Sequence, residues 1–170
     1  MTKRTAFGTV VIGTLLLMGI VGNVRAQHVD QIPGAVVFLN RLGGIYRPGF
    51  DNPLLNTSTI VFHASIVPPF AGDDDDWDSV LRHARTVFAP FDVTVTDVEP
   101  DPATLYIEAV VGGQPGSIGH PNGIIGVAPV YCSPARRSIV FIFSDLAGGD
   151  NTLIAQVIGH EVGHAFSLDH

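Results

Sequence analysis

Apolar residues recur at helical spacing between Trp77 and Phe88. Their positions follow the i, i+3, i+4, i+7 rule, which gathers side chains on one face of an α-helix. The members of this stripe are Trp77, Val80, Leu81, Ala84, Val87 and Phe88. The run Asp73 to Asp76 stands at its start, where carboxylates cap free N–H groups and favour the helix dipole, and Pro90 follows its end. The pattern predicts an amphipathic helix between the aspartates and Pro90.

Five other stretches have the patterns of β-strands. Residues 35–39 and 138–143 are unbroken apolar runs, and the second is typical of a central strand covered on both faces. Residues 91–98 and 105–111 alternate apolar and polar side chains, which places one face of each strand on a core. Residues 124–131 form a short strand for which Pro129 favours a sheet edge, because proline cannot donate a ladder hydrogen bond.

Two neighbouring stretches have weaker signals. Residues 41–56 contain several glycines and prolines and are predicted as turns and loop. Residues 59–67 are predicted as a second extended stretch that ends at Pro68 and Pro69. His63 lies inside this stretch, so we expect it to be a core or half-buried histidine.

The order of the elements defines a fold class. A second long helix is expected to begin at Asp150 or Asn151, since either residue is a suitable N-cap. The elements then follow as strand, helix, three or four strands, and helix. We predict an α+β fold (α/β-like) with a twisted mixed sheet of about five strands and two long helices packed on it.

The first residues have the features of a secretory signal peptide. Lys3 and Arg4 precede an apolar run over residues 6–21, and Val24 and Ala26 occupy the small-residue positions before a cleavage site. The run is interrupted by glycines and is shorter than the ~20 residues that span a bilayer, which opposes a membrane anchor. We therefore expect the signal peptide to end at Ala26.

Cleavage after Ala26 leaves residues 27–170 as one secreted domain, extracellular or periplasmic. It removes three of the nine basic residues, so six basic side chains remain against sixteen acidic ones, a formal charge of −10. Nucleic acid and anionic membrane surfaces are therefore unsuitable partners. No feature of the sequence addresses the oligomeric state.

Cys132 is the single cysteine of the sequence and cannot form a disulfide within it. Either it is a buried thiol, or its partner lies on another chain or on further sequence, because an unpaired thiol is unfavourable in an oxidising compartment. His120 lies in a glycine- and proline-rich stretch without a neighbouring ligand pattern, so we interpret it as a loop histidine.

The last eleven residues contain a candidate metal site. His160 and His164 are four residues apart and point from the same face of a helix, which suits two nitrogens binding one zinc ion. Glu161 is rotated by about 100° from His160, so its carboxylate lies beside the metal and can hold a water molecule. His170 can join them only if the helix ends and the chain turns back. Three protein ligands with an open fourth position are typical of catalytic zinc.

The context of this motif favours a metal site over a chance match. Gly159 and Gly163 each cost roughly 1 kcal/mol against alanine in a helix interior, which is unusual for a helix that only packs. A third histidine at the right offset and the export signal support the same conclusion. Calcium ligation by Asp73 to Asp76 is possible but unsupported, and we interpret these residues as a solvated capping run.

The stretch from His160 to His170, HEVGHAFSLDH, resembles the zinc-binding signature of the metzincin metalloendopeptidases, HExxHxxGxxH. Its ending LDH is most similar to the matrixin-like branch, including secreted bacterial members, as are FAPFDVTVTDVEP and SIVFIFSD upstream. The resemblance implies a zinc endopeptidase in which His160, His164 and His170 bind Zn²⁺ and Glu161 is the general base. It also implies a peptide or protein substrate extended along an edge strand, for which residues 124–131 are the candidate.

The chain departs from the family in two ways. Ser167 replaces the glycine between the second and third histidines, where a left-handed backbone costs a non-glycine residue roughly 1–2 kcal/mol. The printed sequence also stops at His170, so we expect an N-terminal metzincin subdomain with the C-terminal subdomain missing.

Two rival hypotheses remain. The first is a truncated, catalytically inactive zinc-binding or interaction protein with the same fold. The second is an RNA-processing metalloprotein with similar histidine spacing, which Glu161, the signal peptide and the negative charge oppose.

Overall fold

The computed structural model describes residues 34–169, so the predicted signal peptide, the start of the mature domain and His170 lie outside the described residues. The main sheet has five strands in the order β5-β1-β6-β8-β7, and β7 is the one strand that pairs antiparallel. The strands are β1 (Ala35–Asn40), β5 (Val93–Thr96), β6 (Tyr106–Val111), β7 (Gly126–Val127) and β8 (Ser138–Ile142). The predicted mixed α+β fold is confirmed.

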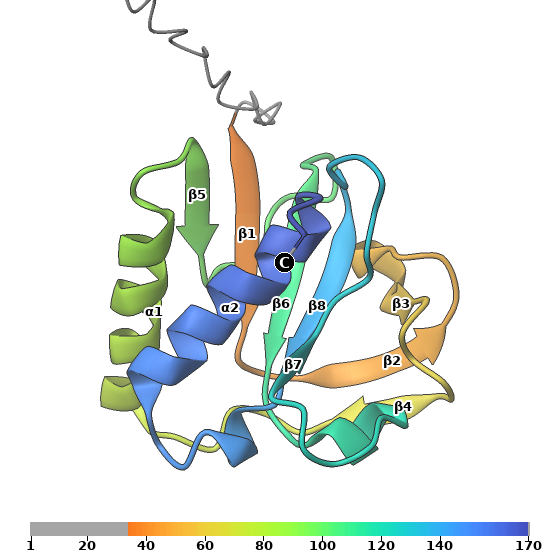
Figure 1. Cartoon of the computed structure of the whole chain (residues 1–170), viewed down its shortest axis with the longest axis horizontal. Coiled ribbons are helices and arrows are strands. Elements are labelled where there is room, and N and C mark those ends of the chain that lie inside the picture. Colours follow the sequence, from red (N-terminus) through yellow and green to blue (C-terminus); the bar gives the residue numbers. More distant parts are fainter. Residues whose placement is uncertain (1–33, 170) are drawn as a thin grey trace, which may run out of the picture.

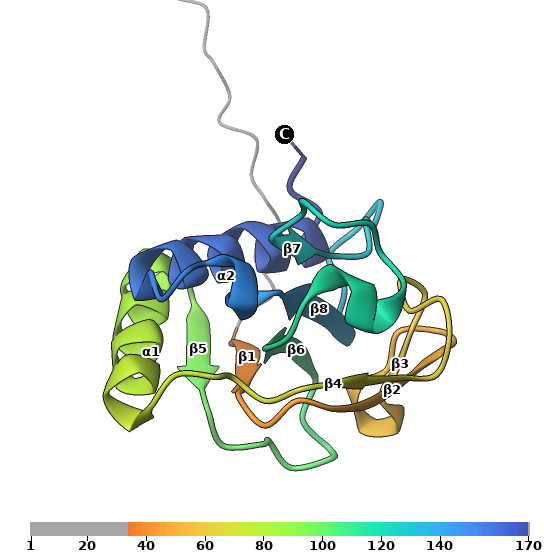
Figure 2. The ribbon, with the colours of Figure 1, turned by 90° about the horizontal axis from the view of Figure 1, so that it is seen from below.

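The main sheet is covered on both faces (Figures 1 and 2). The helices α1 (Asp74–Phe88) and α2 (Asn151–Ala165) pack against each other and against one face. A second sheet of three strands, in the order β3-β2-β4, lies on the opposite face. Its strands are β2 (Gly44–Pro48), β3 (Thr57–Ser58) and β4 (Ser65–Val67). Short 3₁₀ turns occupy Pro53–Leu55, Pro115–Ile118 and Ser144–Leu146.

The alternation of side chains along the central strands builds two cores. In β8, Val140 and Ile142 join the core under the helices, whereas Ile139 and Phe141 join the core under the small sheet. Such a strand must be apolar on both faces, and SIVFIF meets this condition. The sequence prediction of a central strand at residues 138–143 is therefore confirmed.

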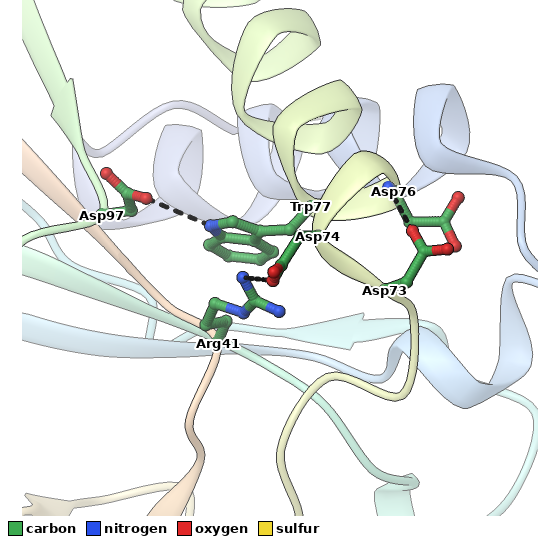
Figure 3. A network of polar contacts seen from close by, with 6 residues as sticks. All are labelled: Arg41, Asp73, Asp74, Asp76, Trp77 and Asp97. Carbon is green, nitrogen blue, oxygen red and sulfur yellow. Dashed lines mark hydrogen bonds and ion pairs between the residues drawn. The ribbon is translucent and has the colours of Figure 1, made fainter.

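Helix α1 is held at its first turn by polar contacts that Figure 3 shows. Asp73 is the N-cap, and its Oδ1 accepts a hydrogen bond from the Asp76 N–H at 2.9 Å, as the capping interpretation predicted. The Trp77 indole N–H donates to Asp97 at 3.2 Å, and Arg41 lies over the indole ring and pairs with Asp74 at 2.8 Å. Asp74 is exposed, so this ion pair adds little, and the buried Trp77 side chain is the main anchor.

Two sequence predictions were wrong and one was incomplete where distant segments decide the structure. Residues 41–56 are not only loop, because β2 forms there by pairing with β4 some twenty residues later. Residues 59–67 are not one extended stretch, since only Ser65–Val67 is a strand, and His63 is exposed. The sequence placed one face of β6 on a core and did not predict that the small sheet covers the other face and buries Glu108 there.

The interpretation of Gly159 as unusual for a helix that only packs was also wrong. A Cβ atom on Gly159 would lie 2.6 Å from the Val87 side chain of α1, closer than real Cβ contacts come. This glycine therefore lets the two helices approach each other, which is a packing role. Within residues 34–169, neither helix is long and apolar enough to cross a membrane.

Candidate metal centre

The last two turns of α2 bring the first two histidines of the motif together. The Nε2 atoms of His160 and His164 are 3.2 Å apart, and the two rings are nearly perpendicular. His160 is exposed and His164 is half-buried, so the pair lies at the surface. The i, i+4 spacing thus gives the convergence of nitrogens that the sequence predicted.

The chain reverses immediately after the helix, as the motif requires. Ser167 has a φ of +66°, in the left-handed region that the missing glycine would favour. The Leu168 N–H donates to the Gly163 carbonyl at 3.0 Å and the Ser167 N–H to the His164 carbonyl at 2.9 Å. These two bonds form a Schellman motif, which ends a helix and turns the chain back. The predicted reversal is confirmed, and serine adopts it in place of glycine.

This reversal also orients His164. The Leu168 carbonyl lies 2.9 Å from Nδ1 of His164. A carbonyl oxygen can only accept, so Nδ1 carries the proton and Nε2 presents a lone pair. Metal-binding histidines commonly hold their second ring nitrogen in this way, which fixes both the tautomer and the ring. Sequence reasoning missed this contact, because its acceptor is a backbone atom that only the turn places.

Glu161 lies on the inner side of the same helix. Its side chain is 7% exposed, and burial raises its pKa to about 7, while the neighbouring His164 acts in the opposite direction. A carboxyl group with a pKa near neutrality is suited to accept and release protons at physiological pH.

The carboxylate also lies against β7, the last strand of the main sheet. Figure 2 shows this strand beside α2. Gly126 of β7 is in contact with both Glu161 and Val157 of the helix. The sequence predicted an edge strand at residues 124–131; its position at the edge is confirmed, but only Gly126–Val127 forms the strand. Its contact with Glu161 was not predicted, because helix and strand are far apart in the sequence.

Other candidate residues fall outside this centre. His120 is a loop residue, as predicted, and its Nε2 lies 2.7 Å from the Ile60 carbonyl while its ring stacks on Phe62. Cys132 is exposed, which excludes the buried-thiol alternative, and a partner on another chain or on further sequence stays a prediction. Within residues 34–169 no three histidine, cysteine or acidic side chains gather in a group that could hold a metal, and the expected third ligand, His170, lies outside that range.

The two histidines nevertheless fit zinc. Two nitrogens at ~2.0–2.1 Å from a tetrahedral zinc ion are about 3.3 Å from each other, close to the observed 3.2 Å between the Nε2 atoms. Nε2 of His164 has a lone pair available for a metal, since the Leu168 carbonyl holds the ring proton on Nδ1.

Comparison of the chain with known protein families, with curated proteins and with solved structures found no match. The assignment of a function therefore depends on these residues and their geometry.

Proposed function

We propose that this protein is a secreted zinc-dependent endopeptidase. One observation carries the proposal: two histidine Nε2 atoms converge at 3.2 Å, and a buried glutamate between these histidines in the sequence lies against β7, the last strand of the main sheet within residues 34–169. A ligand pair, a proton acceptor and a surface for an extended peptide thus occur within one turn of helix and one strand.

His160, His164 and His170 would hold the zinc ion, with His164 oriented by the Leu168 carbonyl. When bound, zinc supplies Lewis acidity, which lowers the pKa of a water molecule towards ~7 and polarises a carbonyl group. The chain itself supplies the proton transfers. Glu161 accepts a proton from the attacking water on its carboxylate and returns it to the amine nitrogen of the leaving peptide.

β7 would supply the substrate surface. It pairs with β8 on one side and is the last strand of the sheet, so its second edge can pair with an extended peptide. Backbone hydrogen bonds of this kind give affinity for peptides of many sequences. The acidic composition of the chain supports a peptide or protein substrate over nucleic acid.

Native mass spectrometry of the protein recovered from its own source is the first test, because one spectrum reports both the chain and a bound metal. We expect one zinc ion in the wild-type protein and in Glu161→Gln, and none after the double change His160→Ala and His164→Ala. Dye-labelled casein then reports peptidase activity, which we expect in the wild type and not in Glu161→Gln. Glu99→Gln, at an exposed position after β5, is the matched control and should cleave like the wild type.

The outcomes separate the proposal from its rivals. Zinc binding without casein cleavage in the wild type would support the inactive zinc-binding hypothesis. Equal cleavage by the wild type and Glu161→Gln would refute the role given to Glu161. Cleavage of RNA and not of casein by the zinc-loaded wild type would support the RNA-processing metalloprotein, and absence of zinc from the wild type would refute the proposal as a whole.

A further inference from the structure

We infer that Gly126 is a positioning residue for the reaction, because its missing side chain leaves the space in which the Glu161 carboxylate stands under the edge strand. This inference rests on the proposed function. It concerns a residue without a side chain of its own, which acts on the reaction through the position of the Glu161 carboxylate.

The contact geometry defines the space. A Cβ atom on Gly126 would lie 2.6 Å from Oε1 and 2.8 Å from Cγ of Glu161, and 2.7 Å from Cγ1 of Val157. Real Cβ atoms essentially never approach other heavy atoms below 3.0 Å. Any residue except glycine at position 126 must therefore displace the Glu161 side chain, Val157 or the strand itself.

The backbone conformation at position 126 does not explain why this residue is a glycine. Gly126 does not have the positive φ that favours glycine, unlike Gly123 nearby with a φ of +100°. An alanine could adopt this backbone without strain, so the side chains of α2 are what require a glycine here.

The pattern of β7 agrees with this role. Val127 packs with the core under the small sheet, and Ala128 packs with the core under the helices. Side chains alternate along a strand, so position 126 faces the helices together with position 128. Of the two residues of β7, the one that faces α2 is thus glycine, whereas Ile125 before the strand also packs with the core under the helices.

The Glu161 carboxylate is the part that would give way. Gly126 pairs with Ile142 of the fully buried strand β8, which holds the strand backbone in place. Helix α2 is packed on α1 through Gly159 and on the sheet through its buried residues. The carboxylate, in contrast, is the end of a flexible side chain. A methyl group at position 126 should therefore move the general base away from the strand on which the substrate lies, without unfolding the protein.

The test compares Gly126→Ala with Gly116→Ala. A Cβ atom on Gly116 meets nothing within 4 Å, and this glycine also lacks a positive φ, so the control adds the same methyl group in open space. The double variant Gly126→Ala with Val157→Ala removes the valine contact and leaves the conflict with Glu161. We expect all three variants to keep the melting temperature within a few degrees of the wild type and to bind one zinc ion.

Two readouts report the position of the carboxylate. With dye-labelled casein, kcat should fall by roughly tenfold to a hundredfold in both Gly126 variants, with KM nearly unchanged, because a base displaced by about 1 Å loses its alignment. In metal-free protein at one pH, the ¹³C carboxyl resonance of Glu161, assigned by its loss in Glu161→Gln, should shift in both Gly126 variants. Neither quantity should change in Gly116→Ala.

The outcomes separate this inference from the proposed function. An unshifted Glu161 resonance with wild-type kcat in Gly126→Ala would overturn the inference. Unfolding of both Gly126 variants, while Gly116→Ala stays folded, would also overturn it and assign Gly126 a purely structural role. If the zinc-loaded wild type does not cleave casein, the proposed function fails, and the Glu161 resonance still decides whether Gly126 positions the carboxylate.

Discussion

Two buried glutamates lie on opposite faces of the main sheet and differ in what surrounds them. Glu108 and Glu161 are 3% and 7% exposed, and burial raises the pKa of each to about 7. Glu108 sits in the central strand β6, where Tyr46 and Asn40 both donate to its Oε1 at 2.8 Å. Glu161 sits at the sheet edge beside two converging imidazoles.

The difference shows that a shifted pKa alone does not identify a catalytic group. Strand β6 and the small sheet enclose Glu108, so no substrate can approach it, and its Oε2 has no hydrogen-bond partner within the described residues. Burial of that carboxyl group costs stability when it ionises. Burial also raises the pKa of Glu161, but this residue lies against the last strand of the sheet, on the same helix as the two converging histidines. This position at the sheet edge is the reason why we propose Glu161, and not Glu108, as the general base.

The largest expected effect is on catalysis, and it should fall on one glutamate only. Glu161→Gln should lower kcat/KM on casein by about 10²–10⁴-fold, the contribution usual for a positioned proton acceptor. Glu108→Gln keeps the shape of the side chain far from the edge and should leave kcat/KM within about twofold of the wild type. Loss of activity in a folded Glu108→Gln protein would break the comparison.

The second prediction concerns stability and pH. The unfolded chain ionises Glu108 above about pH 4.5, whereas the folded protein keeps it protonated up to about pH 7. The folded state therefore binds the extra proton, and the stability that this group contributes should be highest below pH 4.5, fall as the pH rises to about 7, and stay constant above that. The loss from this group is about 3 kcal/mol at most.

Urea unfolding between pH 4.5 and 8 measures the stability lost when Glu108 ionises, as the difference in unfolding free energy between the wild type and Glu108→Gln. The variant lacks the titration, so we expect it to gain up to about 3 kcal/mol relative to the wild type at pH 8. Parallel curves for the two proteins would show that Glu108 does not carry the pH dependence.

The third prediction sharpens the account of Glu108. Tyr46→Phe removes a buried O–H that donates to Oε1 at 2.8 Å, and such a loss should cost about 1–3 kcal/mol. That hydrogen bond lowers the pKa of Glu108, so its removal should extend the fall in stability to higher pH. Urea unfolding of the variant over the same pH range checks both effects. If stability stopped falling at the same pH in Tyr46→Phe as in the wild type, Tyr46 would not lower the pKa of Glu108.

The smallest expected effect lies in the turn after α2. Ser167→Gly removes the strain of a left-handed serine and should stabilise the protein by at most about 1–2 kcal/mol, reduced by the greater flexibility of the unfolded glycine chain. The turn holds the Leu168 carbonyl on His164, so zinc affinity should stay the same or rise. Thermal unfolding and zinc titration measure the two quantities, and a weaker zinc affinity would contradict this account of the turn.

Much of the centre was visible in the sequence because its determinants are local. The spacing of His160 and His164 on a helix sets their convergence, and the position of Ser167 required a left-handed turn, which its φ of +66° confirms. The contact of Gly126 with Glu161 was not predictable in this way, because it depends on where a helix crosses a strand. Gly159 was misinterpreted for the same reason, since its neighbour Val87 belongs to the other helix.

The sequence by itself determined the two helices, with their aspartate caps, and the buried strand β8, because periodicity and capping act within a few residues. Only the tertiary structure decided that a glycine- and proline-rich stretch contributes β2 and that the small sheet covers β6. The side of β6 that carries Glu108 also carries Tyr106 and Val110, so its own pattern does not decide what covers it. Whether such a face meets water or another segment depends on pairing between strands far apart in the chain, which no local pattern records.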